Sequence, residues 1–213
     1  MKRRIILPLD NKTVRESQNI ISKTSDLVWG YKIRRQILEA GTGFINEHDN
    51  MMVDFKLYDI PSAMEESAQL YLDTGAKIVT AHCSAEWIPP NTAMALHIAG
   101  VTVITSFKKV PMYSMYTSID GLVQHFVEYV INPYNYGFMV CSPKELKNVK
   151  TEALKITPGI RPSWYQEEDD QARTMTPKEA VEAGSDLLVI GRPLLNSKDI
   201  RGAIQKTIEE IGE

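Results

Sequence analysis

Short runs of apolar and β-branched residues alternate along the chain with longer segments of helical periodicity. Runs of four to eight such residues are typical of buried strands, whereas apolar residues spaced three and four apart are typical of amphipathic helices. The pattern predicts eight strands, over residues 4–9, 27–32, 51–57, 77–82, 101–106, 136–141, 154–157 and 186–191. Helices are predicted between them, among others over residues 13–23, 63–74, 121–131 and 143–149.

Turn and capping residues support this alternation. Thr176-Pro177-Lys178-Glu179 predicts a helix start, with a hydroxyl cap, proline at the first helical position and glutamate closing a capping box. Eight strands, each followed by a helical segment, predict an α/β fold, a single (β/α)8 TIM barrel spanning residues 1–213. An open doubly wound sheet is the alternative, but no Gly-x-Gly-x-x-Gly follows the first strand.

Composition narrows the classes of function. The 213 residues are 43% hydrophobic and 24% charged, with a net charge of −3, which is typical of a globular protein. No apolar run approaches about 18 residues, so we expect no membrane partner. The Lys and Arg residues are scattered, so we expect no nucleic acid partner. Cys83 and Cys141 lack a metal-type spacing and predict a reduced, cytoplasmic setting.

The strand predicted over residues 51–57 carries unusual charges near its end. Asp54 and Lys56 point the same way in an extended strand, and Asp59 lies just beyond, before Ile60-Pro61. Unpaired charges are costly in a core, so these side chains belong either to an exposed edge strand with a surface ion pair or to a chemical site.

Other predicted strands also end in polar residues. The C-terminal ends of barrel strands form the active-site face of this architecture, so their polar residues are candidates for chemistry. The loops after strands seven and eight are its usual phosphate site, and Arg192 offers a planar donor fork suited to phosphate. The candidates outside residues 54–61 are Asp10, Lys32, His82, Thr105, Ser106, Pro158, Gly159, Ile160, Arg161, Gly191 and Arg192. His82 is better explained by a structural role, as a hydrogen-bonded residue of the barrel mouth.

Five segments together resemble the orotidine 5'-phosphate decarboxylase family. They are Leu9-Asp10, Asp54-x-Lys56-x-x-Asp59-Ile60-Pro61, Thr157-Pro158-Gly159-Ile160-Arg161-Pro162, Asp170-Gln171-x-Arg173-x-Met175-Thr176-Pro177 and Val189-Ile190-Gly191-Arg192-Pro193. They occur in unbroken order between about residues 4 and 200, and the second is the most specific.

The resemblance implies a role for each matching residue. Asp10 and Lys32 would bind ribose hydroxyls, Thr105 would face the pyrimidine, and Ile60 and Pro61 would complete the motif at the substrate site. Phosphate would be held by Gln171, Gly191 and Arg192, with Pro158, Gly159 and Arg161 on the neighbouring loop. Asp54, Lys56 and Asp59 would form the catalytic array, with Asp59 reaching the site of a second subunit in a homodimer.

The implied reaction is decarboxylation of orotidine 5'-phosphate to uridine 5'-phosphate and CO2, with Lys56 as proton donor and neither metal nor organic cofactor. Two alternatives remain open from the sequence. One is a metal-dependent sugar-phosphate lyase or aldolase of the same barrel type, and the other is a non-catalytic nucleotide-binding barrel.

Overall fold

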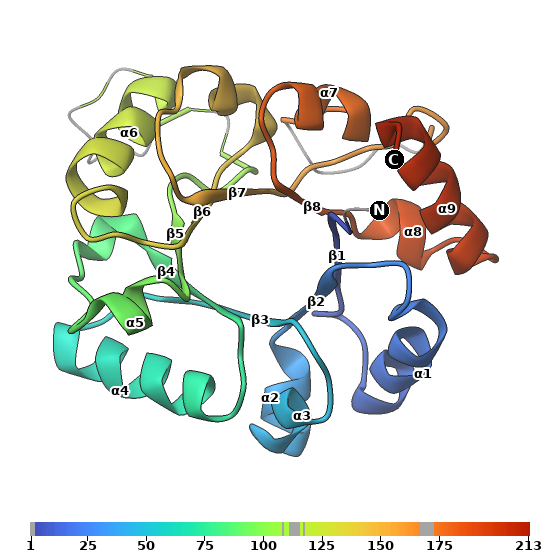
Figure 1. Ribbon diagram of the computed structural model, residues 1–213, viewed down its shortest axis with the longest axis horizontal. Coiled ribbons are helices and arrows are strands. Elements are labelled where there is room, and N and C mark those ends of the chain that lie inside the picture. The colour runs from blue at the N-terminus through green and yellow to red at the C-terminus, as the bar shows by residue number, and fades with distance from the viewer. Residues whose placement is uncertain (1–2, 108, 111–115, 117, 167–172) are drawn as a thin grey trace.

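In the computed structural model, eight parallel strands close into a barrel in the order of the chain, as Figure 1 shows. Pairing of β1 with β8, in the register Ile6 to Val189, closes the ring. The structure describes residues 3–107, 109–110, 116, 118–166 and 173–213. The strands are β1 (Ile5–Pro8), β2 (Gly30–Ile33), β3 (Met51–Leu57), β4 (Ile78–His82), β5 (Ile98–Val101), β6 (Phe138–Val140), β7 (Leu154–Thr157) and β8 (Leu187–Val189). The predicted barrel is therefore confirmed.

Helices surround the ring of strands on its outer side (Figure 1). The α-helices are α1 (Val14–Thr24), α2 (Arg35–Ala40), α3 (Gly43–Asn46), α4 (Pro61–Asp73), α5 (Thr92–Ala95), α6 (Ile119–Phe126), α7 (Pro177–Glu182), α8 (Arg192–Leu195) and α9 (Ile200–Ile211). Shorter turns are the 3-10 helices η1 (Cys83–Ala85) and η3 (Pro143–Asn148) and the π-helix η2 (Val127–Ile131). Within the described ranges, no helix has the length and apolar character needed to cross a membrane.

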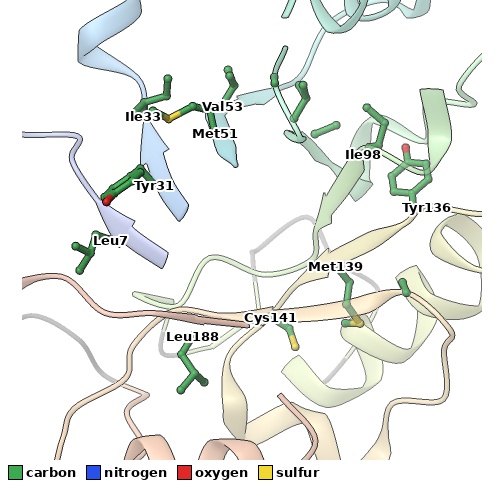
Figure 2. Close-up of a cluster of buried hydrophobic side chains, with 14 of the residues drawn as sticks. Leu7, Tyr31, Ile33, Met51, Val53, Ile98, Tyr136, Met139, Cys141 and Leu188 are labelled. Atoms are coloured by element: carbon green, nitrogen blue, oxygen red, sulfur yellow. The ribbon is translucent and has the colours of Figure 1, made fainter. Parts of the chain in front are cut away.

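Strand alternation divides the core into two layers, because successive side chains point to opposite faces of a sheet. Ile6, Met52 and Ile78 belong to the small cluster that fills the barrel interior. Their neighbours along the strands, such as Leu7, belong to the larger cluster that packs against helix residues including Met64 of α4. Figure 2 shows part of that larger cluster, with Leu188 contributed by β8.

Predicted and observed strand boundaries coincide only for β3 and β7, and one predicted strand is largely misplaced. We predicted strand five at residues 101–106, but β5 is Ile98–Val101, paired with β4 and β6. Gly100 lowers the strand propensity of this segment, yet a Cβ there would come within 2.9 Å of the Cys83 sulfur. Close packing thus requires glycine inside the strand. Thr105 consequently lies in the loop after β5.

Local signals at helix starts were more reliable. The Thr176 hydroxyl accepts a hydrogen bond from the Glu179 amide, and the Glu179 carboxylate accepts one from the Thr176 amide, so the predicted capping box is confirmed. The helix predicted over residues 121–131 is instead α6 followed by the π-helix η2. A change of helical pitch of this kind has no clear signature in apolar spacing.

Candidate active site

Polar residues replace apolar ones where the inward-facing positions of neighbouring strands approach the barrel mouth. Asp54 lies two residues beyond Met52 on β3, and Thr80 lies two residues beyond Ile78 on β4. Alternation therefore aims both at the barrel axis, above the apolar interior layer. Lys32 joins them from β2.

Four charged side chains at the barrel mouth, those of Asp10, Lys32, Asp54 and Lys56, form one chain of ion pairs. Lys32 Nζ donates hydrogen bonds to a carboxylate oxygen of Asp10 and, at 2.7 Å, to Oδ2 of Asp54. Lys56 Nζ donates to the same Oδ2 of Asp54 at 2.8 Å. The Asp54 side chain is 7% exposed, whereas that of Lys56 is 32% exposed. The array is thus anchored in the barrel and reaches the mouth at Lys56.

Thr80 fixes the other oxygen of Asp54, and sequence reasoning missed this role. Its hydroxyl lies 3.0 Å from Asp54 Oδ1, and it accepts a hydrogen bond of 2.9 Å from the Lys56 amide. Threonine inside the otherwise apolar run Ile78-Val79-Thr80-Ala81 was the available signal. Thr80 therefore couples the carboxylate to the backbone of the lysine.

The backbone at Lys56 departs from the regular strand that we predicted. The register of β3 against β4 shifts between Val53 and Leu57, and Lys56 has a φ of 53°. A left-handed conformation is unfavourable for a side chain of this size and persists where the surroundings enforce it. The irregularity, rather than simple alternation, brings the ammonium of Lys56 to Asp54.

Electrostatics favour the charged forms of Asp54 and Lys32, the two central members of the array. Burial opposes ionisation of Asp54, but the ammonium groups of Lys32 and Lys56 outweigh it and hold the pKa of that carboxyl below its ordinary value. Burial likewise opposes the charge on Lys32, yet Asp54 and Asp10 raise its pKa above the ordinary value. Burial and nearby Lys56 lower the pKa of His82, whose ring lies edge-on to Tyr58. A neutral His82 adds no competing positive charge.

A cavity of about 470 Å³ opens beside this array, at the ends of β1, β2, β7 and β8. The Oδ1 atom of Asp10 is buried there without a hydrogen-bond partner among the described residues, so it can accept from a ligand hydroxyl. Gly159 has a φ of 81°, a conformation that favours glycine. The lining residues are Pro8, Asp10, Asn11, Lys12, Lys32, Pro158, Gly159, Arg161, Val189, Gly191, Arg192, Leu195 and Asn196.

Not every predicted site residue meets this group. Asp59 is exposed, and its Oδ1 accepts a hydrogen bond of 2.7 Å from the Ile60 amide; among the described residues it forms no ion pair with Lys56. Ile60 caps α4 and Pro61 begins it. Gln171 lies outside the described residues. The cavity thus joins Asp10 and Lys32 to the loops after β7 and β8.

A closed parallel barrel with charged side chains gathered at the carboxyl ends of its strands defines a (β/α)8 enzyme. The family described as orotidine 5'-phosphate decarboxylase / HUMPS matches residues 3–207. The chain belongs to this family.

Individual relatives match over nearly their whole length. The orotidine 5'-phosphate decarboxylase of Caulobacter vibrioides is 32% identical over 229 residues, covering 98% of this chain and 97% of the relative. That of Glaesserella parasuis is 28% identical and covers 93% and 94%. The crystal structure of the Lactobacillus acidophilus decarboxylase has a TM-score of 0.78 at 22% identity, covering 99% of this chain and 100% of that one. That structure supports the fold.

Proposed function

We propose that this chain is a cytoplasmic carboxy-lyase that converts orotidine 5'-phosphate to uridine 5'-phosphate and CO2 in pyrimidine biosynthesis. The observation that carries the proposal is the partly buried chain of alternating charges from Asp10 through Lys32 and Asp54 to Lys56. The family and the names of the relatives support the same reaction.

The chemistry needs an ammonium where charge develops. Loss of CO2 from pyrimidine C6 leaves the electron pair of the broken bond on that carbon, with no conjugated carbonyl placed to accept it. Lys56 stabilises this carbanion and then transfers a proton to it, so that the step balances without a metal or an organic cofactor. Asp54 repels the substrate carboxylate and holds Lys56 in position through the 2.8 Å contact.

The rest of the substrate supplies binding energy away from the reacting carbon. In this proposal, Asp10 and Lys32 bind ribose hydroxyls, for which the unpartnered Oδ1 of Asp10 is a ready acceptor. Arg192 and Arg161 bind the phosphate in the cavity, together with the backbone of Gly191 and Gly159. Gln171 joins them from the loop after β7, and Thr105 faces the pyrimidine.

A homodimer would complete the site with Asp59 of the second chain. Asp59 is exposed between Tyr58 and Ile60, which are themselves 66% and 64% exposed. Large exposed apolar side chains beside an exposed acid are suited to a two-fold contact that buries all three. We propose that each Asp59 then lies near the Lys56 of the other subunit.

Following the loss of orotidine 5'-phosphate absorbance with and without a chelator tests the reaction. Turnover that is insensitive to the chelator is the expected result. Turnover of sugar phosphates that the chelator abolishes would instead favour a metal-dependent lyase or aldolase. Binding of uridine 5'-phosphate without any turnover would favour a non-catalytic nucleotide-binding barrel.

A further inference from the structure

Arg173 is a buried arginine that joins three loops of the barrel mouth. It follows β7 in the chain, and its guanidinium donates to Glu145 Oε1 at 2.7 Å, in the 3-10 helix η3 after β6. It also donates to the carbonyl oxygens of Ile104 at 2.9 Å and Thr105 at 3.3 Å, in the loop after β5. One side chain thus holds two segments that lie 28 and 68 residues before it in the sequence.

Glu145 is itself fixed, so Arg173 is anchored to a rigid point. The second oxygen of Glu145, Oε2, accepts a hydrogen bond of 3.0 Å from the Ser142 amide as part of the capping box of η3. Arg173 is 8% and Glu145 4% exposed. A buried ion pair adds little stability over well-packed apolar residues, whereas a planar guanidinium can hold several acceptors in one geometry. Geometry is therefore what this pair contributes.

The backbone beside Arg173 belongs to the phosphate side of the cavity. Met175 pairs with Ile160, and the Arg161 amide donates to the Met175 carbonyl at 2.9 Å. Gly159 and Arg161 line the cavity. The residues around Arg173 are thus tied to the proposed phosphate loop, while its side chain is tied to the loop that carries Thr105.

We propose that Arg173 is a positioning residue that sets the pyrimidine-facing loop of the site against its phosphate-binding side. By holding the carbonyls of Ile104 and Thr105, it fixes where the Thr105 side chain meets the base. This inference rests on the proposed function, because it requires a nucleotide with its phosphate near Arg161 and Arg192 and its base near Thr105.

The test compares Arg173→Met with Arg4→Met, a matched control at the opposite end of the barrel. Arg4 also binds one carboxylate, that of Glu213, and two carbonyls, those of Ser185 and Asp186. For each protein we would measure the dissociation constants of uridine 5'-phosphate and of ribose 5-phosphate. The dissociation constant of ribose 5-phosphate divided by that of uridine 5'-phosphate gives the contribution of the base.

Arg173→Met should lower this ratio by about tenfold or more, while binding of ribose 5-phosphate stays within about twofold, because the lost hydrogen bonds are those that place the base-side loop. Arg4→Met should leave the ratio unchanged even where it lowers the melting temperature. In a Thr105→Ala background, Arg173→Met should lower the ratio by no more than about twofold, since both changes remove one interaction.

A second variant, Arg173→Lys, separates positioning of the loop from charge pairing with Glu145. It also provides the test if the methionine variant does not fold. It retains a cation for Glu145 but lacks the fork that also reaches Ile104 and Thr105. The ratio should still fall. If the lysine variant, or a folded methionine variant, has the same ratio of dissociation constants as the wild-type protein, the inference is overturned. If the wild-type protein neither decarboxylates orotidine 5'-phosphate nor favours uridine 5'-phosphate over ribose 5-phosphate, the proposed function itself fails, which is a different result.

Discussion

Asp54 organises the mouth of the barrel at the scale of single residues. Its two oxygens meet two ammonium groups and one hydroxyl, those of Lys32, Lys56 and Thr80. These three partners come from three strands, β2, β3 and β4. The position of Lys56 therefore depends on partners that do not themselves react.

Thr80→Val should reveal this dependence. Valine has nearly the same shape, but it removes the hydroxyl that meets Asp54 Oδ1 and the Lys56 amide. We expect kcat/KM for decarboxylation to fall by roughly tenfold to a hundredfold, as for loss of a hydrogen bond to a buried charged group. Thr207→Val removes an equally buried hydroxyl from α9 and should leave kcat/KM unchanged. Equal activities of the two variants would contradict the role of Thr80.

The lowered pKa of Asp54 predicts how stability responds to acid. A carboxyl whose pKa in the folded state lies below its unfolded value of about 3.8 contributes stability above that pH, and the contribution is lost as pH falls through the folded pKa. The free energy of unfolding should therefore differ more between wild type and Asp54→Asn at pH 6 than at pH 3. Denaturant titrations measure this difference. Asp49→Asn, at an exposed position, serves as the control.

At the scale of elements, local sequence patterns located most of the fold. Strands β3 and β7 have the predicted boundaries, and α7 begins at its predicted capping box. The prediction failed for β5, where tight packing around Gly100 matters more than strand propensity. It also missed the contact of Arg173 with Glu145 and the bond of Thr80 to Asp54, because each joins residues at least 26 positions apart. Such contacts are set by the closure of the barrel.

The loops after β7 and β8 carry a prediction about the phosphate. Arg192 is exposed in the cavity, so Arg192→Ala should weaken binding of uridine 5'-phosphate by about 1.5–3 kcal/mol, as for loss of a hydrogen bond to a charged group. Binding of uridine, which lacks the phosphate, should barely change. Calorimetry on both ligands measures this, with Arg201→Ala as a control because Arg201 pairs with Asp26 on the outer surface. Equal losses for both ligands would assign Arg192 to the fold instead.

At the scale of the whole molecule, the proposed dimer makes each site a product of two chains. Lys56→Ala and Asp59→Ala homodimers should both be inactive. Mixing and exchanging their subunits should restore about a quarter of wild-type activity, because half of the dimers are then mixed and each has one intact site. Mass measurements would establish the exchange. A mixture that exchanges yet stays inactive would place Asp59 in the site of its own chain.

The central claim is that Lys56 is the proton donor of a decarboxylase, and Lys56→Ala tests it most directly. We expect turnover of orotidine 5'-phosphate to fall by about a thousandfold or more, because the change removes both a general acid and the charge that stabilises the carbanion. Affinity for uridine 5'-phosphate should be largely retained, since phosphate and ribose contacts remain. Lys155→Ala, which removes a lysine paired with Asp186, should leave turnover intact. A Lys56→Ala enzyme that retains a substantial fraction of wild-type turnover would contradict the account.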